Sequence, residues 1–162
     1  MSVRHLFDQA FYLSKYPDVA AAGIDPYTHY MIFGWKENRD PNLYFSTYFY
    51  TSVNPDVVAA NKNPLEHYNE FGIQELRDPS PFFDTSIYLQ QNTDVANGAT
   101  NPLEHFIVYG DKEGRNVHEL FNATFYLSNN PDVASAVSDG TTTALEHFVR
   151  FGHKEGRDPS AD

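Results

Sequence analysis

Four histidines recur along the chain, each four residues before an aromatic residue. They are His29, His67, His105 and His147. Imidazole nitrogens can bind zinc, alone or with the neighbouring His118 and His153, but zinc needs three or four ligands that converge on it. No HxxxH or HxH pair supplies two ligands from one helix. The pattern instead favours half-buried imidazoles that pack on the following aromatic ring and hydrogen-bond to a backbone carbonyl or a tyrosine hydroxyl.

Aspartates and arginines recur with the same regularity. Three of the four aspartates follow a proline, and Asp94 follows Thr93, at the start of a predicted helix, where a carboxylate faces the positive end of the helix dipole. The arginines lie in polar connectors. We expect ion pairs between the two sets across the interfaces between repeats. The residues are Asp18, Asp56, Asp94, Asp132, Arg39, Arg77, Arg115 and Arg157.

A second set of aspartates precedes prolines in the connectors: Asp40, Asp78 and Asp158. Calcium takes six to eight oxygen ligands, often from irregular loops, so these carboxylates are candidate metal ligands together with Asp8 or Asp84. The sequence contains no EF-hand spacing and no glycine-rich nonapeptide repeat. Salt bridges and helix caps are therefore the main expectation for these residues, and calcium is the alternative. We expect no other cofactor.

An active site needs unlike groups in different roles, such as an acid, a base and an orienting group. Here each polar residue type recurs in every repeat, which argues against catalysis. Aromatic residues that depart from the repeat are better candidates for a specific surface, because they can stack on sugars or anchor a protein partner. We select Trp35, Tyr44 and Phe82 as candidate ligand-binding residues, with packing between repeats as the alternative.

The elements that position these residues are set by an internal period. Phenylalanines recur every 38 residues, at Phe7, Phe45, Phe83 and Phe121, and the fourth repeat carries an insertion of four residues around 138–141. A fixed period of this length is typical of repeat architectures. The sequence predicts one all-α domain, a solenoid of four stacked units of about 38 residues. The repeats cover about 6–42, 43–80, 81–118 and 119–160.

Each repeat predicts three short helices. The first begins after an N-cap residue such as Asp8 or Ser46, and the second begins at a proline such as Pro17. The third is marked at both ends, as in the segment 101–110, which has Asn at the N-cap, proline next and glycine last. We predict a left-handed backbone at that glycine. Helices this short are marginal alone, so neighbouring repeats must cover their apolar faces.

The composition of the chain disfavours several classes of partner and of cellular location. The formal net charge is −11, which disfavours binding to nucleic acid. No apolar run approaches the roughly 20 residues of a membrane span, so we expect no membrane insertion. The absence of cysteine excludes disulfides and thiolate metal sites. The first residues lead into the first repeat without the apolar stretch of a secretory signal, so any export would use another route.

The phrases at 131–134, 145–148 and 151–159 resemble short tandem repeats of large bacterial secreted proteins, often of the haemolysin-type, calcium-binding, type I secreted class. Similar repeats are appended to some bacterial glycosyltransferases. The resemblance covers 6–159 and implies an extracellular or cell-surface location, with a cytoplasmic location as the alternative. It assigns no catalytic residue. Asn116-Val117 departs from the Asp-Pro ending of the other repeats.

These observations predict a non-enzymatic structural or interaction module of a bacterial surface or secreted protein, with an adhesion, matrix or spacer role. Its partner would be a protein or a glycan at the cell surface. A carbohydrate-binding module that uses exposed aromatics is the first alternative. An accessory domain of a glycan-synthesis enzyme is the second.

Overall fold

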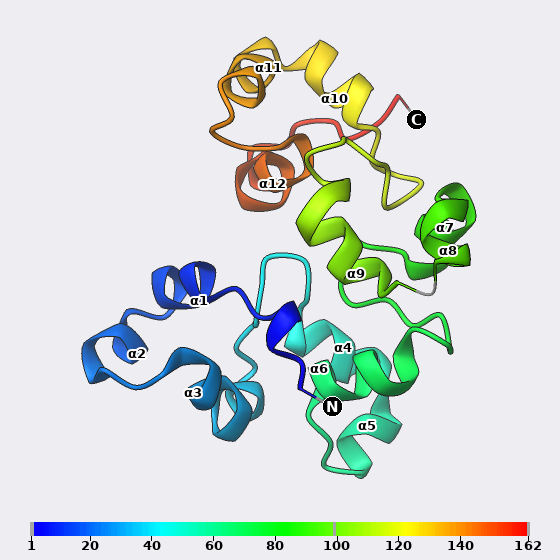
Figure 1. Cartoon of the computed structure of the whole chain (residues 1–162). Coiled ribbons are helices and arrows are strands. Elements are labelled where there is room, and N and C mark those ends of the chain that lie inside the picture. Colours follow the sequence, from blue (N-terminus) through cyan, green and yellow to red (C-terminus); the bar gives the residue numbers. More distant parts are fainter. Residues whose placement is uncertain (1, 99, 162) are drawn as a thin grey trace. The chain divides into compact units, whose positions relative to one another are not determined.

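The computed structural model describes residues 2–98 and 100–161 and is built from short helices (Figure 1). Within those ranges no strand is longer than an isolated bridge, and such bridges join Asn42 to Phe45, Ser80 to Phe83 and His118 to Phe121. The predicted all-α class is confirmed. The α-helices are α1 (Gln9–Lys15), α2 (Pro17–Ala22), α3 (Pro26–Ile32), α4 (Thr47–Val53), α5 (Pro55–Ala59), α6 (Pro64–His67), α7 (Thr85–Gln91), α8 (Thr93–Asn97), α9 (Pro102–His105), α10 (Ala123–Asn129), α11 (Pro131–Ser138), α12 (Ala144–His147) and α13 (His153–Glu155).

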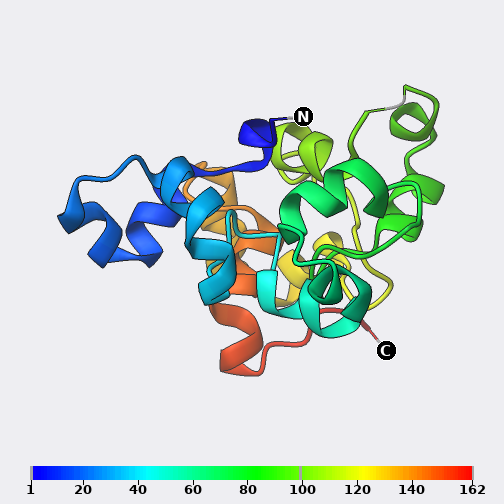
Figure 2. The same cartoon turned by 90° about the horizontal axis from the view of Figure 1, so that it is seen from below.

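The chain forms two compact units, Met1–Ser86 and Ile87–Asp162. In the first unit α1, α2 and α3 contact one another, and α4 contacts both α5 and α6. In the second unit α10, α11 and α12 form the same kind of three-helix cluster. Figure 2 shows the cluster of the first repeat, in blue, from a second direction. The stacking of all four repeats into one solenoid stays a prediction.

Side-chain caps start the first and third helices of the repeats, as their sequences predict. Asp8 accepts a hydrogen bond from the Phe11 amide at the start of α1. Asn63 accepts from two amides at the start of α6, and Thr143 accepts from the Glu146 amide at α12. These bonds satisfy backbone donors that have no partner within the helix. The caps therefore fix where each short helix begins.

The third helix of most repeats widens before it ends. A π-helical turn follows α6, α9 and α12, at Tyr68–Gly72, Phe106–Gly110 and Phe148–Gly152. In the first repeat a 3₁₀ turn, Gly34–Glu37, follows α3 instead. The sequence predicted a single regular helix here, so the change of helix type is a feature that the apolar period did not reveal.

The prediction of a left-handed glycine at the end of this helix was wrong. The positive-φ residues of the described chain do not include Gly34, Gly72, Gly110 or Gly152; the left-handed residue lies four positions later, at Asn38, Leu76, Gly114 and Gly156. Glycine is needed for another reason. A Cβ atom on it would collide with the hydroxyl group of Tyr12, Tyr50, Tyr88 or Tyr126, respectively. These tyrosines are fully buried and form the centre of each repeat.

Candidate functional site

The recurring histidines are held by the buried tyrosines. The hydrogen bond between the tyrosine hydroxyl and histidine Nδ1 is 3.0 Å long in the first two repeats and 2.9 Å in the last two. Each imidazole also packs on the aromatic ring four residues later, with ring centroids 5.4–5.9 Å apart. Both expected contacts are confirmed. The pairs are Tyr12–His29, Tyr50–His67, Tyr88–His105 and Tyr126–His147.

Burial and neighbouring charges shift the pKa of these groups. Burial raises the pKa of the Tyr50 hydroxyl above its ordinary value of 10.0, so this group stays protonated at neutral pH. Burial lowers the pKa of His67 below 6.5, and the positive charge of Arg77 lowers it further. A neutral imidazole hydrogen-bonded to a neutral phenol is the state that this environment favours.

The recurring arginines form ion pairs within their own repeats. Arg77 donates to both oxygens of Asp56 at 2.9 Å, to Glu75 at 2.6 Å and to the Asn54 side-chain oxygen at 2.8 Å. The expectation of pairs across the interfaces between repeats was therefore wrong. The connector turns back over the second helix of its own repeat, where the Arg77 amide also donates to the carbonyl of Gly72. The other pairs are Arg39–Asp18, Arg115–Asp94 and Arg157–Asp132.

Each arginine is fixed on several sides. Its hydrogen bonds lower the pKa of the paired aspartate. The amide nitrogen of Asn54 donates to the Tyr50 carbonyl, which orients the Asn54 oxygen toward Arg77. In the first repeat Tyr16 replaces this asparagine, and the Arg39 guanidinium lies 4.9 Å from the Tyr16 ring centroid. The arginines thus join the connector to the helical core.

The aspartates of the connectors join consecutive repeats. Asp40 accepts from the Thr47 amide at 2.8 Å and from Lys15 at 2.7 Å, and Asp78 accepts from the Thr85 amide at 2.8 Å. Thr47 and Thr85 open the first helix of the next repeat, so these two carboxylates act as helix caps. Asp158 is exposed. In the part of the chain that the structure describes, no group of three or more His, Asp or Glu side chains is placed to hold a metal ion.

The aromatic residues selected from the sequence are covered to different degrees. Tyr44 is only 6% exposed, so its ring belongs to the core and is not presented to a ligand. Trp35 and Phe82 are half-buried. The Trp35 indole donates to the Met31 carbonyl at 3.1 Å, and the Lys36 ammonium lies 5.3 Å from the ring centroid. Trp35 therefore keeps one accessible side at most.

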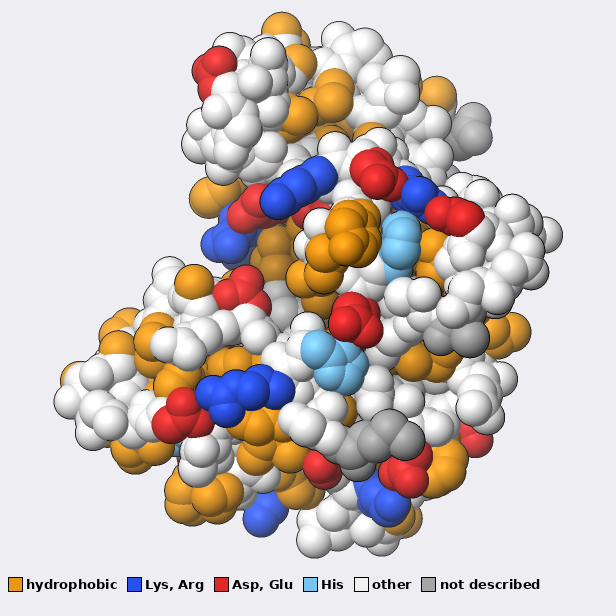
Figure 3. All heavy atoms as spheres, viewed as in Figure 1, with side chains coloured by type: hydrophobic (Ala, Val, Ile, Leu, Met, Phe, Trp, Pro, Cys, Tyr) orange, Lys and Arg blue, Asp and Glu red, His pale blue; other side chains and the backbone are white. Residues whose placement is uncertain are grey.

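The exposed rings lie at a different position, the residue that packs on each histidine. One face of this ring covers the imidazole, and about half of the side chain remains exposed. Exposures are 52% for Phe33, 40% for Phe71, 57% for Tyr109 and 52% for Phe151. The sequence showed this recurring position, but the expected packing on histidine did not show that about half of the residue stays exposed. At Phe71 the Lys62 ammonium also lies 5.4 Å from the ring centroid. Figure 3 shows apolar side chains reaching the surface beside paired acidic and basic side chains.

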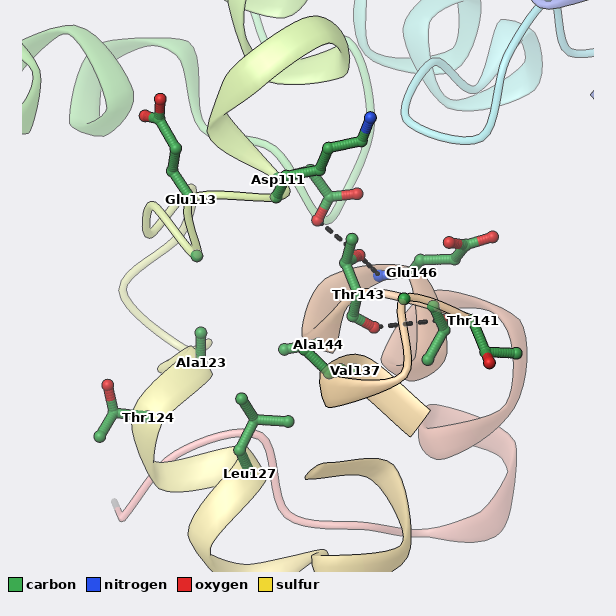
Figure 4. Close-up of a pocket in the computed structure, with 14 residues that line it drawn as sticks. Asp111, Glu113, Ala123, Thr124, Leu127, Val137, Thr141, Thr143, Ala144 and Glu146 are labelled. Atoms are coloured by element: carbon green, nitrogen blue, oxygen red, sulfur yellow. Dashed lines mark hydrogen bonds between the residues drawn. The ribbon is translucent and has the colours of Figure 1, made fainter. Parts of the chain in front are cut away.

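The second unit also contains a half-open groove of about 580 Å³ (Figure 4). The turn at 111–114, α10, the end of α11 with the inserted loop, and the start of α12 line it. Its floor is apolar and includes Leu127, Val137 and Ala144. At the rim the Thr143 hydroxyl donates to Asp111 at 2.7 Å. The inserted residues around 138–141 thus form one wall of the groove.

No family model, curated protein or solved structure matches this chain. Across residues 2–98 and 100–161, no helix combines the length and the apolar character needed to cross a bilayer. The described helices are short; α11, for example, has eight residues.

Proposed function

We propose that this chain is a non-enzymatic interaction module of a bacterial surface or secreted protein, in which repeated exposed rings form the contact surface. The observation that carries the proposal is a difference between the polar and the aromatic residues of each repeat. The tyrosine hydrogen-bonds to the histidine, and the arginine forms an ion pair with the aspartate. By contrast, the ring at the position of Phe33 is left about half exposed.

The pairing of the polar groups supports a structural role for them. A nucleophile or general base must reach a substrate, but each recurring tyrosine is buried and bonded to its histidine. Each recurring arginine is engaged with an aspartate. These contacts recur in every repeat, which suits a residue needed for folding each unit.

The exposed rings have the properties of binding anchors. Large aromatic side chains contribute disproportionately to protein interfaces, because they bury much apolar area at low conformational cost. The ring of Phe33 rests on His29, whose orientation is fixed by Tyr12. A ring supported in this way loses little freedom when a partner covers its open face. The resemblance to repeats of secreted bacterial proteins agrees with a partner at the cell surface.

The test replaces Phe33, Phe71, Tyr109 and Phe151 with serine in one variant. Wild-type protein and variant are compared for binding to intact bacterial cells and to an array of surface glycans. We expect the variant to lose at least about tenfold in affinity, as for typical interface anchors. Tyr48→Ser is the matched control, because Tyr48 is 68% exposed but does not pack on a histidine. Equal binding by wild type and the four-ring variant would refute the proposal.

A carbohydrate-binding module is the second candidate, and the regular recurrence of the rings favours it. A glycan presents the same sugar ring repeatedly, and aromatic faces stack on sugar rings. The glycan array separates this candidate from protein adhesion. Specific sugar binding that the four-ring variant loses supports it, and Trp35→Ala tests whether the half-buried indole takes part.

A further inference from the structure

The four exposed rings differ in one contact. Phe71 is the least exposed of them, at 40%, and the ammonium group of Lys62 lies 5.4 Å from its ring centroid. The carboxylate of Glu70 lies 3.9 Å from the same ammonium group. The equivalent rings of the other three repeats are 52–57% exposed. The lower exposure of Phe71 agrees with a lysine that covers part of its ring.

Lys62 reaches the ring from a position that recurs in the chain. It precedes Asn63, the N-cap of α6, and a residue at this position can pack against the fourth residue of the helix, here His67. Since His67 stacks on Phe71, a side chain at position 62 is brought next to the ring. The equivalent residues, all uncharged, are Ile24, Thr100 and Thr142. The first, third and fourth repeats thus present the ring without its lysine.

Lysine ammonium groups lie over aromatic rings at other places in the chain as well. Lys15 lies 5.2 Å from the centroid of Phe11, and Lys36 lies 5.3 Å from that of Trp35. The cation is attracted by the negative face of the ring in such contacts. Among the described residues, no lysine or arginine lies over the three more exposed rings of the recurring position.

The residue that precedes each ring determines how well a lysine from outside would fit. In the first and third repeats it is Ile32 or Val108, exposed by 49% and 45%. Their apolar surface suits the methylene stem of a lysine side chain. In the fourth repeat it is Arg150, whose positive charge disfavours a second cation. Phe33 and Tyr109 are therefore the rings best suited to receive a lysine.

From these contacts we infer that Phe33 and Tyr109 bind lysine side chains of a basic partner polypeptide, in the way that Phe71 holds Lys62. The formal net charge of −11 attracts a basic segment to this chain at long range. The inference rests on the proposed role of the exposed rings and names the chemistry of the partner. Because Phe33 and Tyr109 lie in different compact units, each acts as a separate site.

The probe is a short peptide of alternating lysine and glycine. The matched control is the same peptide with every lysine acetylated, which removes the charge. Binding to the whole chain is followed by chemical-shift changes of the backbone amides at 32–34 and 108–110. We expect saturable shifts with the lysine peptide and weaker binding after acetylation.

Two variants remove the rings without changing the net charge: Phe33→Leu and Tyr109→Leu. Each should weaken binding at its own site by about two- to fivefold, the loss typical of an exposed cation–π contact. Long-range attraction by the acidic chain stays the same in both variants, so the loss reports the ring itself. A retained helical circular dichroism spectrum shows that each variant still folds.

The second repeat supplies a control within the same chain. With Lys62 in place, the amides around Phe71 should not respond to the peptide, because the lysine already covers the ring. Lys62→Thr introduces the residue type of the third repeat and should make these amides respond. Lys112→Thr changes the net charge equally at another exposed site and should leave them unresponsive.

The inference is overturned if the acetylated peptide binds as well as the lysine peptide, or if both ring variants fold and bind like the wild type. It is also overturned if Phe71 responds equally with and without Lys62. The assay on cells and glycans decides the proposed function separately. Ring-dependent binding there without a preference for lysine here would retain the proposed function and reject the basic partner.

The opposite result is also distinguishable. If the four-ring variant binds cells and glycans like the wild type, the proposed function is refuted whatever the peptides show.

Discussion

The junction between the first two repeats and the junction between the last two use the same positions differently. At the first, Thr47 donates its amide to Asp40 at 2.8 Å and its hydroxyl to the Arg39 carbonyl at 2.7 Å, and the Tyr30 hydroxyl lies 3.5 Å from that of Thr47. At the last, Ala123, Asn116 and Phe106 replace Thr47, Asp40 and Tyr30. The cap at this position is longer, 3.4 Å from the Ala123 amide to the Asn116 side-chain oxygen, and Thr143 donates to Asp111 across the same junction at 2.7 Å.

Inside the repeats the contrast disappears. The hydrogen bond between tyrosine and histidine and the ion pair between arginine and aspartate have nearly the same lengths in the first and in the last repeat. The comparison shows that the recurring residues make the contacts inside each repeat, while the residues at the junctions differ from one junction to another. At the last junction Ala123 takes the place of the buried Thr47, and a groove lies beside it.

The largest expected effect concerns a feature common to both regions. Gly34→Ala and Gly152→Ala should each destabilise the protein by about 3 kcal/mol, since the new methyl group collides with a buried tyrosine hydroxyl and overpacked cores lose this much. Urea unfolding measures the loss. Gly140→Ala is the control: its site has open space and only a positive φ, so it should cost about 1 kcal/mol. Equal losses at all three positions would show that close packing on tyrosine is not the reason for glycine.

A smaller effect should separate the two junctions. Thr47→Val removes a fully buried hydroxyl that serves the Arg39 carbonyl and adjoins Tyr30, so we expect a loss of about 2 kcal/mol. Ala123→Val at the equivalent position removes no hydrogen bond. The change in urea midpoint caused by Ala123→Val therefore reports overpacking alone. This change should be the same in the wild type and in a Phe106→Tyr background. A neutral Thr47→Val variant would contradict the polar description of the first junction.

The connector aspartates should differ in the same manner. Asp40→Ala removes the acceptor of the first α4 amide, Thr47, while the Ser46 N-cap remains, and should cost about 1 kcal/mol. Asp158→Ala, at an exposed site, should change stability by less than about 0.5 kcal/mol. Melting curves of wild type in EDTA and in excess calcium complete the test. Because the caps already use the carboxylates of Asp40 and Asp78, we expect the same midpoint in both. A higher midpoint with calcium that Asp40→Ala removes would assign a metal to this loop instead.

The smallest effect is a dependence on pH. The pKa of His67 is lowered in the folded protein by burial and by Arg77, so below pH 6.5 the unfolded chain binds more protons at this site. Stability should therefore fall as the pH decreases from about 6.5 and level off below the folded-state pKa. His67→Gln should reduce this slope, measured by urea unfolding between pH 7 and 5. An unchanged slope in the variant would mean that His67 is not the group responsible.

The sequence predicted the local features well because their causes are local. Asp8, Asn63 and Thr143 cap helices through amides two or three residues away, so the pattern of residue types is enough to locate them. The class of fold follows from the same signals. The position of the exposed rings was visible as well, since Phe33 and its equivalents recur at one place in each repeat.

Features that depend on tertiary contacts were not predictable in this way. A period identifies which residues recur but not which repeat supplies a partner: Arg39 could reach Asp18, 21 residues earlier, or Asp56 in the next repeat, and the fold selects Asp18. Likewise, glycine at 34 reads as a left-handed cap until the nearby Tyr12 hydroxyl is known. The groove depends on an insertion and several small residues that meet only in space.

The most direct test of the account is the stability of four single variants that remove the hydroxyl from the recurring tyrosines. The variants are Tyr12→Phe, Tyr50→Phe, Tyr88→Phe and Tyr126→Phe. If this residue exists to build each repeat, all four should lose a similar free energy of unfolding, about 1 kcal/mol for one lost hydrogen bond to histidine. Stability unchanged in all four, or a loss confined to one repeat and accompanied by loss of binding, would contradict the account.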